Sequence, residues 1–166
     1  MGFPVETKNA TIPANMAATL PYLRTGFVAA TTGAPISSFS MMVATKKTMG
    51  VVMLTVPSTY FTAKDMTAEH VYYSNDQLLA ALRDGEINAA LIWQPWLNQT
   101  LTAHPQNLRI SPLNMAHAAW NIVGLYPKSD KNSEAVREFN HGVASLAASA
   151  VLANIIKPYD VPTIHQ

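Results

Sequence analysis

The 166-residue sequence contains no cysteine, and only 13% of its residues are charged. Without cysteine there is no disulfide framework, thiolate zinc site, iron–sulfur cluster or cysteine nucleophile. The few charges nearly cancel, at a formal net charge of +1, so no strong positive field attracts a phosphate backbone. We therefore expect no nucleic-acid partner.

Long apolar runs are absent as well. The most apolar stretches, at residues 144–156 and 89–96, are too short or too interrupted to cross a bilayer, so we expect no membrane span. The chain opens without the basic start and apolar core of a secretory signal. This beginning is expected of a cytoplasmic protein, or of a secreted one whose leader lies outside these 166 residues.

The sequence motifs that are typical of common catalytic, phosphate-binding and metal sites are also missing. The five histidines form no HxH, HxxxH or HExxH pattern, and the sequence lacks GxSxG, GxGxxG and GxxxxGK[ST]. We therefore expect no metal site, no bound cofactor and no catalytic residue in this chain. A serine triad requires no fixed spacing, so an enzyme remains the less favoured alternative.

Most of the chain alternates between patterns typical of strands and patterns typical of helices. Three prolines within residues 1–21 predict extended chain there. We expect strands at 22–32, 50–55, 70–73 and 88–93, near 108–110 and at 117–126. We expect helices at 36–47, from 57 onward, between 74 and 85 and from 95 through 101. A last helix, capped by Asn132 or Ser133, is expected to run through residue 150, because its apolar residues keep helical spacing; Gly142 bends or divides it. This order predicts one α/β domain over residues 1–166, with a mostly parallel sheet flanked by helices.

The clearest local signal is the helix expected between Ser74 and Gly85. Ser74 and Gln77 fit a capping box, in which each side chain accepts a hydrogen bond from a backbone N–H at the helix start. Three leucines between them and Gly85 form an apolar stripe. Gly85 is placed to end the helix in the left-handed region of backbone conformation.

Two tryptophans, Trp93 and Trp96, follow one another at the end of the strand expected at 88–93. Side chains at the carboxyl ends of parallel strands lie where α/β folds usually bind ligands. Trp93 and Trp96 are therefore candidates for a binding surface. The alternative is that both indoles simply pack in the core.

Three segments carry a resemblance to known proteins. Residues 82–95, LRDGEINAALIWQP, resemble the helix-to-strand segment of type II periplasmic solute-binding proteins. The Trp and Pro at its end resemble more specifically the solute-binding-protein-like accessory proteins of quinoprotein methanol dehydrogenases. Residues 21–26, PYLRTG, and 157–162, KPYDVP, resemble the crossover and the closing segment of the same proteins. The resemblance implies a single type II lobe at 22–162 that follows an extended crossover segment at 1–21, and a periplasmic location.

The chain departs from this family where a small solute would be held. The chain that builds most of the first lobe in those proteins is missing, and Lys8 and Asn9 stand where amino-acid binders carry a carboxylate-binding arginine. Leu54 and Thr55 replace a Gly-Thr turn, and Trp93 replaces an acidic residue. Because a single lobe without these groups cannot enclose a small polar solute, we expect a protein as the ligand.

The resemblance thus implies a non-catalytic periplasmic accessory subunit or maturation factor of a quinoprotein alcohol dehydrogenase. The small third subunit of the membrane-bound alcohol dehydrogenase of acetic acid bacteria fits this size. Pyrroloquinoline quinone (PQQ) and haem c would belong to partners, namely the catalytic subunit and a cytochrome c subunit. The residues expected to bind the partner are Trp93, Gln94, Trp96, Tyr22 and Arg24. The alternative is a periplasmic solute-binding module that is part of a longer, two-lobed binding protein of the ABC-transporter type.

Overall fold

The computed structural model describes residues 2–6, 11–36, 41, 48–62, 69–113, 115 and 117–157. The chain divides into two compact units, of which unit 1 comprises residues 1–25 and 119–160, and unit 2 comprises residues 26–118 and 161–166. The single domain expected over residues 1–166 stays a prediction. The helix expected at 36–47 lies almost entirely outside the described residues.

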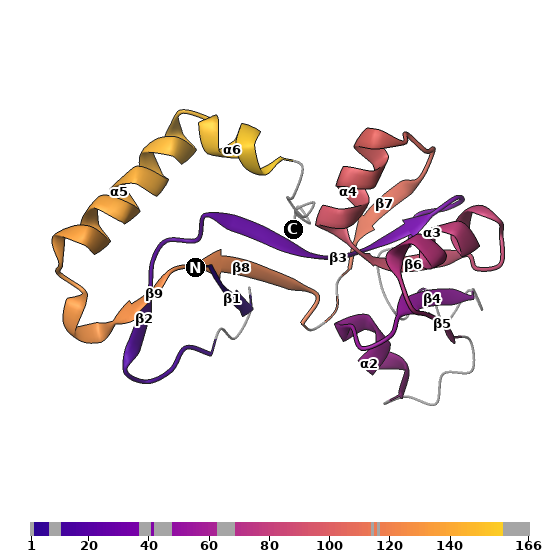
Figure 1. Ribbon diagram of the computed structural model, residues 1–166, viewed down its shortest axis with the longest axis horizontal. Helices are drawn as coiled ribbons and strands as arrows, with labels where there is room; N and C mark the ends of the chain where they lie inside the picture. The colour runs from indigo at the N-terminus through magenta and orange to yellow at the C-terminus, as the bar shows by residue number, and fades with distance from the viewer. Residues whose placement is uncertain are drawn as a thin grey trace. The chain divides into compact units, whose positions relative to one another are not determined.

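Unit 2 is built on a mixed β-sheet (Figure 1). Its strands are β3 (Leu23–Thr31, which starts in unit 1), β4 (Met49–Val52), β5 (Glu69–Tyr72), β6 (Ala89–Trp93) and β7 (Arg109–Pro112). Strand β4 is parallel to both β5 and β6, whereas β3 is antiparallel to both β6 and β7. The α/β class is confirmed, but the expected mostly parallel sheet is corrected to a mixed one.

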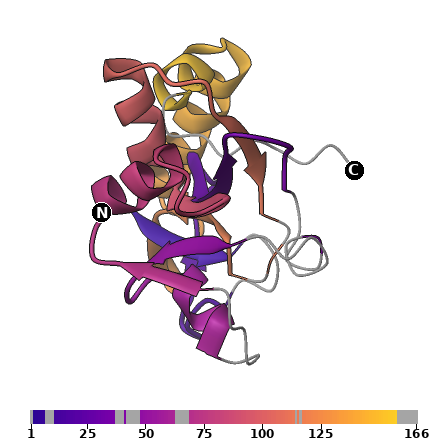
Figure 2. The ribbon, with the colours of Figure 1, turned by 90° about the vertical axis from the view of Figure 1, so that its right-hand side faces the viewer.

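Three described helices belong to unit 2: α2 (Val56–Thr62), α3 (Asn75–Arg83) and α4 (Gln94–Ala103) (Figure 2). Leu78, Leu82 and Leu97 from α3 and α4 form one buried cluster with alternate residues of β3 and β6. The two helices therefore cover the same face of the sheet. The apolar stripe predicted for the helix between residues 74 and 85 is confirmed as part of this core.

The ends of α3 follow the sequence prediction, with one difference. Ser74 Oγ accepts a hydrogen bond from the Gln77 N–H at 3.2 Å, as expected. The Gln77 side chain, however, accepts at 3.1 Å from the N–H of Tyr73, one residue before the cap. Gly85 has a φ of +79°, which confirms the predicted left-handed residue after the helix.

Unit 1 is built from strand pairs and a helix pair. Its strands are β1 (Phe3–Glu6), β2 (Met16–Ala18), β8 (Ala119–Val123) and β9 (Leu125–Pro127). A 3-10 turn, η1 (Lys128–Asp130), precedes α5 (Glu134–Ala148) and α6 (Val151–Ile156). Strand β1 pairs with β8 and β2 pairs with β9, both antiparallel. The extended chain predicted for residues 1–21 is confirmed in the part that the structure describes.

Gly124 divides the single strand expected at 117–126 into β8 and β9. Its N–H donates to Thr19 Oγ1 at 2.9 Å, and its carbonyl accepts from the Thr19 N–H at 2.9 Å. A Cβ at this position would lie 3.1 Å from Thr19 Cγ2, which is a tight contact. The single strand was wrongly predicted because the hydrogen bonds that interrupt it at Gly124 come from Thr19, a residue 105 positions away in the sequence.

The last helical region is divided after Ser149 and not at Gly142. Ser133 caps α5, with its Oγ accepting from the Val136 N–H at 3.4 Å. Ala150, with a φ of 58°, separates α5 from α6, while Gly142 lies inside α5. Of the two caps predicted, Asn132 and Ser133, the structure has Ser133, and the division predicted at Gly142 is wrong.

The buried core is concentrated in unit 2. Among the described residues of unit 1, only Val5, Thr25 and Val123 are buried, and neither α5 nor α6 has a buried residue. Within the part of the chain that the structure describes, no helix is long and apolar enough to cross a membrane.

Candidate binding surface at the carboxyl edge of unit 2

The parallel strands β4, β5 and β6 end at the same edge of the sheet in unit 2. The residues that follow or end them are Met53 and Leu54 after β4, Tyr73 after β5, and Trp93 at the end of β6. The Met53 N–H donates to the carbonyl of Tyr72 at 2.8 Å, which continues the pairing up to this edge. We call these four residues the carboxyl edge. In α/β sheets such an edge is the usual place for ligands.

Leu54 is the most exposed large apolar residue of the carboxyl edge. Its φ is 60° and 94% of its surface is exposed. The N–H and the hydroxyl of Thr55 both donate to the Val52 carbonyl, at 3.3 and 2.6 Å, and close the turn around Leu54. A left-handed conformation costs a non-glycine residue about 1–2 kcal/mol. The strand expected at 50–55 is therefore too long, because the chain turns after Val52.

The rest of this edge is also apolar or aromatic. Tyr73 is 78% exposed and Met53 is 42% exposed, whereas the aliphatic residues inside β4 and β6 are largely buried. None of the four residues is Asp, Glu, Lys, Arg or His. Large exposed apolar residues that gather at one place are typical of surfaces that contact other proteins.

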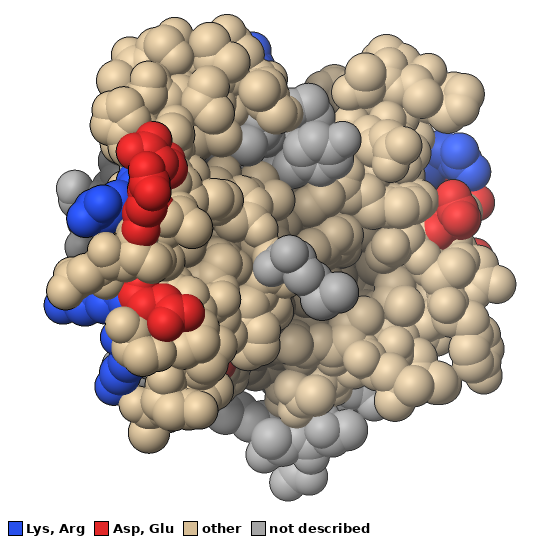
Figure 3. Space-filling view, turned by 60° about the vertical axis from the view of Figure 1, so that its left-hand side comes forward, with Lys and Arg blue, Asp and Glu red and all other residues tan. Residues whose placement is uncertain are grey.

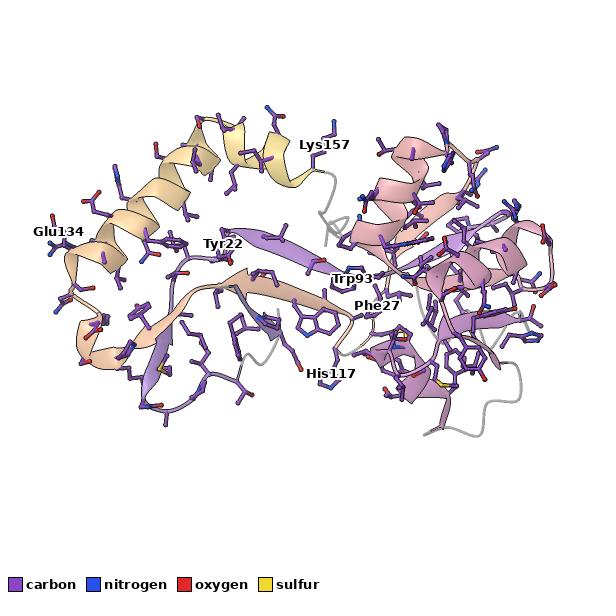
Figure 4. The ribbon with its side chains drawn as sticks, viewed as in Figure 1. Tyr22, Phe27, Trp93, His117, Glu134 and Lys157 are labelled. Atoms are coloured by element: carbon purple, nitrogen blue, oxygen red, sulfur yellow. The ribbon has the colours of Figure 1, made fainter. Side chains whose placement is uncertain are left out.

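Trp93 is a partly buried residue of this edge and packs against Phe27. The two residues are opposite each other in the antiparallel pair of β3 and β6. Their ring centroids are 5.2 Å apart at an interplanar angle of 65°, an edge-to-face contact (Figure 4). Both side chains lie on the sheet face opposite α3 and α4, because alternate residues of a strand point to opposite faces. Trp93 therefore belongs partly to the core and partly to the candidate surface.

Gln94 and Trp96 form the start of α4, directly after Trp93. The Gln94 side chain is buried, and its Oε1 has no hydrogen-bond partner. Trp96 is partly buried and packs against the core cluster of α3 and α4. Of these two predicted contact residues, Trp96 has exposed surface to offer, whereas Gln94 does not.

The two other predicted contact residues, Tyr22 and Arg24, belong to unit 1. The Tyr22 ring packs edge to face on Phe139 of α5, with centroids 6.0 Å apart. The Nε of Arg24 is buried without a hydrogen-bond partner. Lys8 and Asn9, named above in place of a carboxylate-binding arginine, lie outside the described residues. Sequence reasoning missed Met53 and Tyr73, because both appeared to continue strands.

A groove of about 420 Å³ adjoins the carboxyl edge between β5 and α3. It is lined by Val71, Tyr72, Tyr73, Gln77, Ala80, Ala81, Asp84 and Glu86. Burial and, to a smaller degree, the negative charge of Glu86 raise the pKa of Tyr72 above 10.0. The Tyr72 hydroxyl has no hydrogen-bond partner, so the groove holds one buried polar atom among mostly apolar neighbours.

Metal-ligating side chains do not gather in the described part of the chain. No group of three or more His, Asp or Glu residues there is arranged to hold a metal ion. The candidate surface thus offers aromatic and aliphatic contact area with few polar groups. Such a surface suits association with another macromolecule better than capture of a small charged solute.

No family model matches the sequence, and no curated protein matches it. Solved structures do match. The periplasmic binding protein XoxJ from Methylobacterium extorquens AM1 is 17% identical, with a TM-score of 0.64, over 91% of this chain and 74% of that one. The second substrate-binding domain of a putative amino acid ABC transporter from Streptococcus pneumoniae is 19% identical, with a TM-score of 0.62, over 89% and 66%.

Substrate-binding domain 2 of GlnP from Lactococcus lactis, in an open conformation, is 22% identical, with a TM-score of 0.64. It matches over 90% of this chain and 64% of its own length. The chain therefore spans between about two thirds and three quarters of the length of these neighbours. All three are binding proteins or binding domains, and at these identities the likeness concerns the fold. The chain has the fold of the periplasmic solute-binding proteins.

Proposed function

We propose that the chain is a non-catalytic periplasmic accessory subunit or maturation factor. Its partner is the catalytic subunit of a PQQ-dependent alcohol dehydrogenase, which it binds through the carboxyl edge of unit 2. The periplasmic location is taken from one neighbour of the same fold, XoxJ, which is described as a periplasmic binding protein. PQQ and haem c belong to the partner subunits in this proposal, and this chain supplies contact area only.

The observation that carries the proposal is the apolar character of the carboxyl edge. Leu54 stands fully exposed on a left-handed backbone, and Trp93 ends the neighbouring strand. Neither side chain carries a charge that would form an ion pair with the carboxylate or the ammonium group of a small polar solute. A partner protein, by contrast, gains from removing these side chains from water, at roughly 25 cal/mol per Å² of apolar surface.

The choice of a quinoprotein as partner comes from the sequence resemblance at residues 82–95. The segment spans the end of α3, the whole of β6 and the start of α4. It thus includes Trp93, which is part of the proposed contact surface. The sequence resemblance and the exposed apolar residues both favour the carboxyl edge of unit 2 as the contact surface for the partner.

Co-expression with the dehydrogenase catalytic subunit tests the proposal. We expect the two chains to purify together at a fixed ratio. Trp96→Ala should weaken the complex by about 2 kcal/mol, or roughly thirtyfold in Kd, as is usual for a truncated aromatic anchor. His104→Ala, at the exposed far end of α4, is the matched control and should leave binding unchanged.

Trp93→Phe and Leu54→Ser extend the test to the ends of β6 and β4. Thermal melts of each isolated variant establish that it is folded. Unchanged association for all three folded variants, Trp96→Ala included, would remove this edge from consideration. A catalytic subunit that does not bind the parent chain at all would refute the proposed function itself.

The alternative function is a solute-binding module within a longer two-lobed binding protein, and the 64–74% coverage of the neighbours is the observation that favours it. Calorimetric titration with amino acids and short alcohols separates the two functions. An accessory subunit should give no heat of binding. A micromolar Kd for any of these compounds would support the alternative.

A further inference from the structure

The groove between β5 and α3 is large enough for a small organic molecule. Its volume of about 420 Å³ lies within the usual range for small-molecule sites, roughly 300–1,000 Å³. Of its lining residues, only Tyr73 also belongs to the carboxyl edge. The groove is therefore a further candidate site, and its own side chains decide what it can bind.

The two ends of the groove differ in charge. At one end the Tyr73 N–H donates to Gln77 Oε1 at 3.1 Å, so neutral groups line this end. At the other end lie Asp84, which ends α3, and Glu86, which follows it closely. Gln77 and Asp84 are seven positions apart along the helix, which corresponds to about 10 Å. A ligand that fills the groove is therefore about 10 Å long and meets carboxylates at one end.

The acidic end keeps an excess of negative charge. Arg83 Nε lies 3.5 Å from Asp84 Oδ1, with 62% of the Arg83 side chain and 60% of the Asp84 side chain exposed. One guanidinium group thus stands beside two carboxylates, and Glu86 has no ion-pair partner among the described residues. Burial, and to a smaller degree the charge of Glu86, raises the pKa of Tyr72, so this carboxylate acts on the aromatic wall of the groove. A positive group is what this end of the groove favours.

This excess is local, because charged side chains are sparse on the protein. The sequence has 10 Asp and Glu residues among 166, and 11 Lys and Arg residues nearly balance them. On the face that Figure 3 shows, the charged side chains form small groups between wide uncharged areas. Two carboxylates in one groove are therefore a property of this site and not of the surface in general.

An aromatic ring and small side chains line the groove between its ends. The Tyr72 ring lies over Gly50 of β4, where a Cβ would be 3.0 Å from Tyr72 Cε2. The Tyr72 hydroxyl is shielded from solvent, so the ring of this partly buried residue, and not its hydroxyl, is available to a ligand. Ala80 on the facing helix leaves space that a longer side chain would fill. These walls suit an apolar stem, and an aromatic ring also attracts a nearby cation.

The same arrangement disfavours an amino acid or a lysine side chain as the ligand. The α-carboxylate of an amino acid lies beside its ammonium group and would meet Asp84 and Glu86 as a like charge. The four-carbon stem of a lysine side chain is roughly 6 Å long and spans only part of the groove. A free molecule with one positive group at the end of a longer stem fits both ends.

We propose that the groove between β5 and α3 binds a free organic cation. Its ammonium or guanidinium group lies at the Asp84 and Glu86 end, and its apolar or aromatic stem runs along the Tyr72 ring toward Gln77. The inference goes beyond the proposed function, because this site needs no dehydrogenase and the chain by itself is sufficient to bind the ligand.

Titration of the whole chain with 4-phenylbutylamine tests the proposal. 4-Phenylbutanol and 4-phenylbutyrate carry a neutral or a negative group on the same stem, and they are the matched control ligands. We expect the amine to bind about tenfold more tightly than either, as measured by calorimetry. The backbone amide resonances of Tyr73, Gln77, Asp84 and Glu86 should shift on binding, whereas that of Leu54 should not.

Charge variants locate the positive group of the ligand. Glu86→Gln and Asp84→Asn should each weaken binding of the amine about threefold, as is usual for exposed ion pairs, without changing the affinity for 4-phenylbutanol. Arg83→Gln removes a competing positive charge and should tighten binding of the amine about twofold. Asp76→Asn is the matched control, because Asp76 is an exposed acidic residue of α3 that does not line the groove.

A variant that fills the groove gives a readout that does not depend on charge. Ala80→Leu keeps a strong helix former in α3 and should weaken binding of the amine about tenfold or more, because the added side chain occupies the site. Thermal melts establish that each variant is folded. If Ala80→Leu does not fold, the charge variants still decide whether the groove is the site.

The inference is overturned by equal affinities for the amine and 4-phenylbutyrate, or by resonance shifts confined to residues outside the groove. An unchanged affinity in both Glu86→Gln and Asp84→Asn, or in a folded Ala80→Leu variant, has the same consequence. Tighter binding of Nα-acetyl-L-lysine N-methylamide than of the amine would show that the site suits a polypeptide side chain and not a free molecule. None of these results bears on the proposed function, which is tested with the dehydrogenase subunit.

Discussion

Phe27 and Trp93 face each other across the antiparallel pair of β3 and β6, and their rings meet edge to face at 5.2 Å. The contact joins the long strand of unit 2 to the strand that ends at the carboxyl edge. It fixes the Trp93 side chain on the sheet face opposite α3 and α4. The candidate surface is thus anchored in the core through one aromatic pair.

This pair should contribute a measurable coupling energy. In a double-mutant cycle with Phe27→Leu and Trp93→Leu, we expect the free energies of unfolding to be non-additive by about 0.5–1.5 kcal/mol, the usual value for an aromatic pair. Urea unfolding of the parent and the three variants measures the coupling. Additive effects within about 0.3 kcal/mol would show that the rings do not interact.

The exposed residue Leu54 should tolerate glycine. Leu54→Gly relieves about 1–2 kcal/mol of left-handed strain and loses about 0.5–1 kcal/mol to backbone entropy. We expect the free energy of unfolding to stay the same or to rise by up to about 1.5 kcal/mol. Leu20→Gly, at an exposed position without a positive φ, is the control and should be destabilising. Equal losses at both positions would argue against a left-handed Leu54.

The two ends of α3 should respond to substitution in different ways. Ser74→Ala removes the cap hydrogen bond and should lower the free energy of unfolding by about 0.5–2 kcal/mol. A Cβ at Gly85 would meet no atom within 4 Å, so the expected cost of Gly85→Val, about 1–2 kcal/mol, is assigned to the positive φ. Gly33→Val, also without a close neighbour, is the matched control. Identical denaturation midpoints for Gly85→Val and Gly33→Val would contradict the assignment.

The partly buried Tyr72, whose hydroxyl is shielded from solvent, predicts a difference in alkaline stability. Because folding raises the pKa of Tyr72, the neutral phenol is favoured in the folded state. This stabilisation is complete below pH 10.0 and is lost as the pH rises through the raised pKa. Tyr72→Phe removes the titration and an unpartnered hydroxyl. The variant should therefore equal or exceed the parent in stability at pH 7, and its advantage should grow above pH 10.

Urea unfolding at pH 7, 10 and 11 measures this difference. Tyr73→Phe, at an exposed position next to Tyr72, controls for the general effect of losing a phenol. An advantage of Tyr72→Phe that does not change with pH would show that the titration is not linked to folding.

Local signals in the sequence determined the elements that depend on neighbours in the chain. The cap at Ser74 and the left-handed Gly85 are confirmed, and the strand predicted at residues 88–93 is found at 89–93, because each rests on backbone and side-chain groups a few residues apart. The same is true of the Ser133 cap at the start of α5. These predictions needed no knowledge of the rest of the fold.

Only the tertiary structure decided features that involve distant residues. The strand is interrupted at Gly124 by hydrogen bonds to Thr19. The antiparallel direction of β3 depends on its pairing with β6 and β7. The exposure of Leu54 follows from the place where β4 ends in the sheet. The periodicity of α5 predicted an apolar face correctly, but periodicity does not say what covers such a face. A pattern along one chain records which side chains avoid water, whereas their partners are chosen by contacts that only folding brings together.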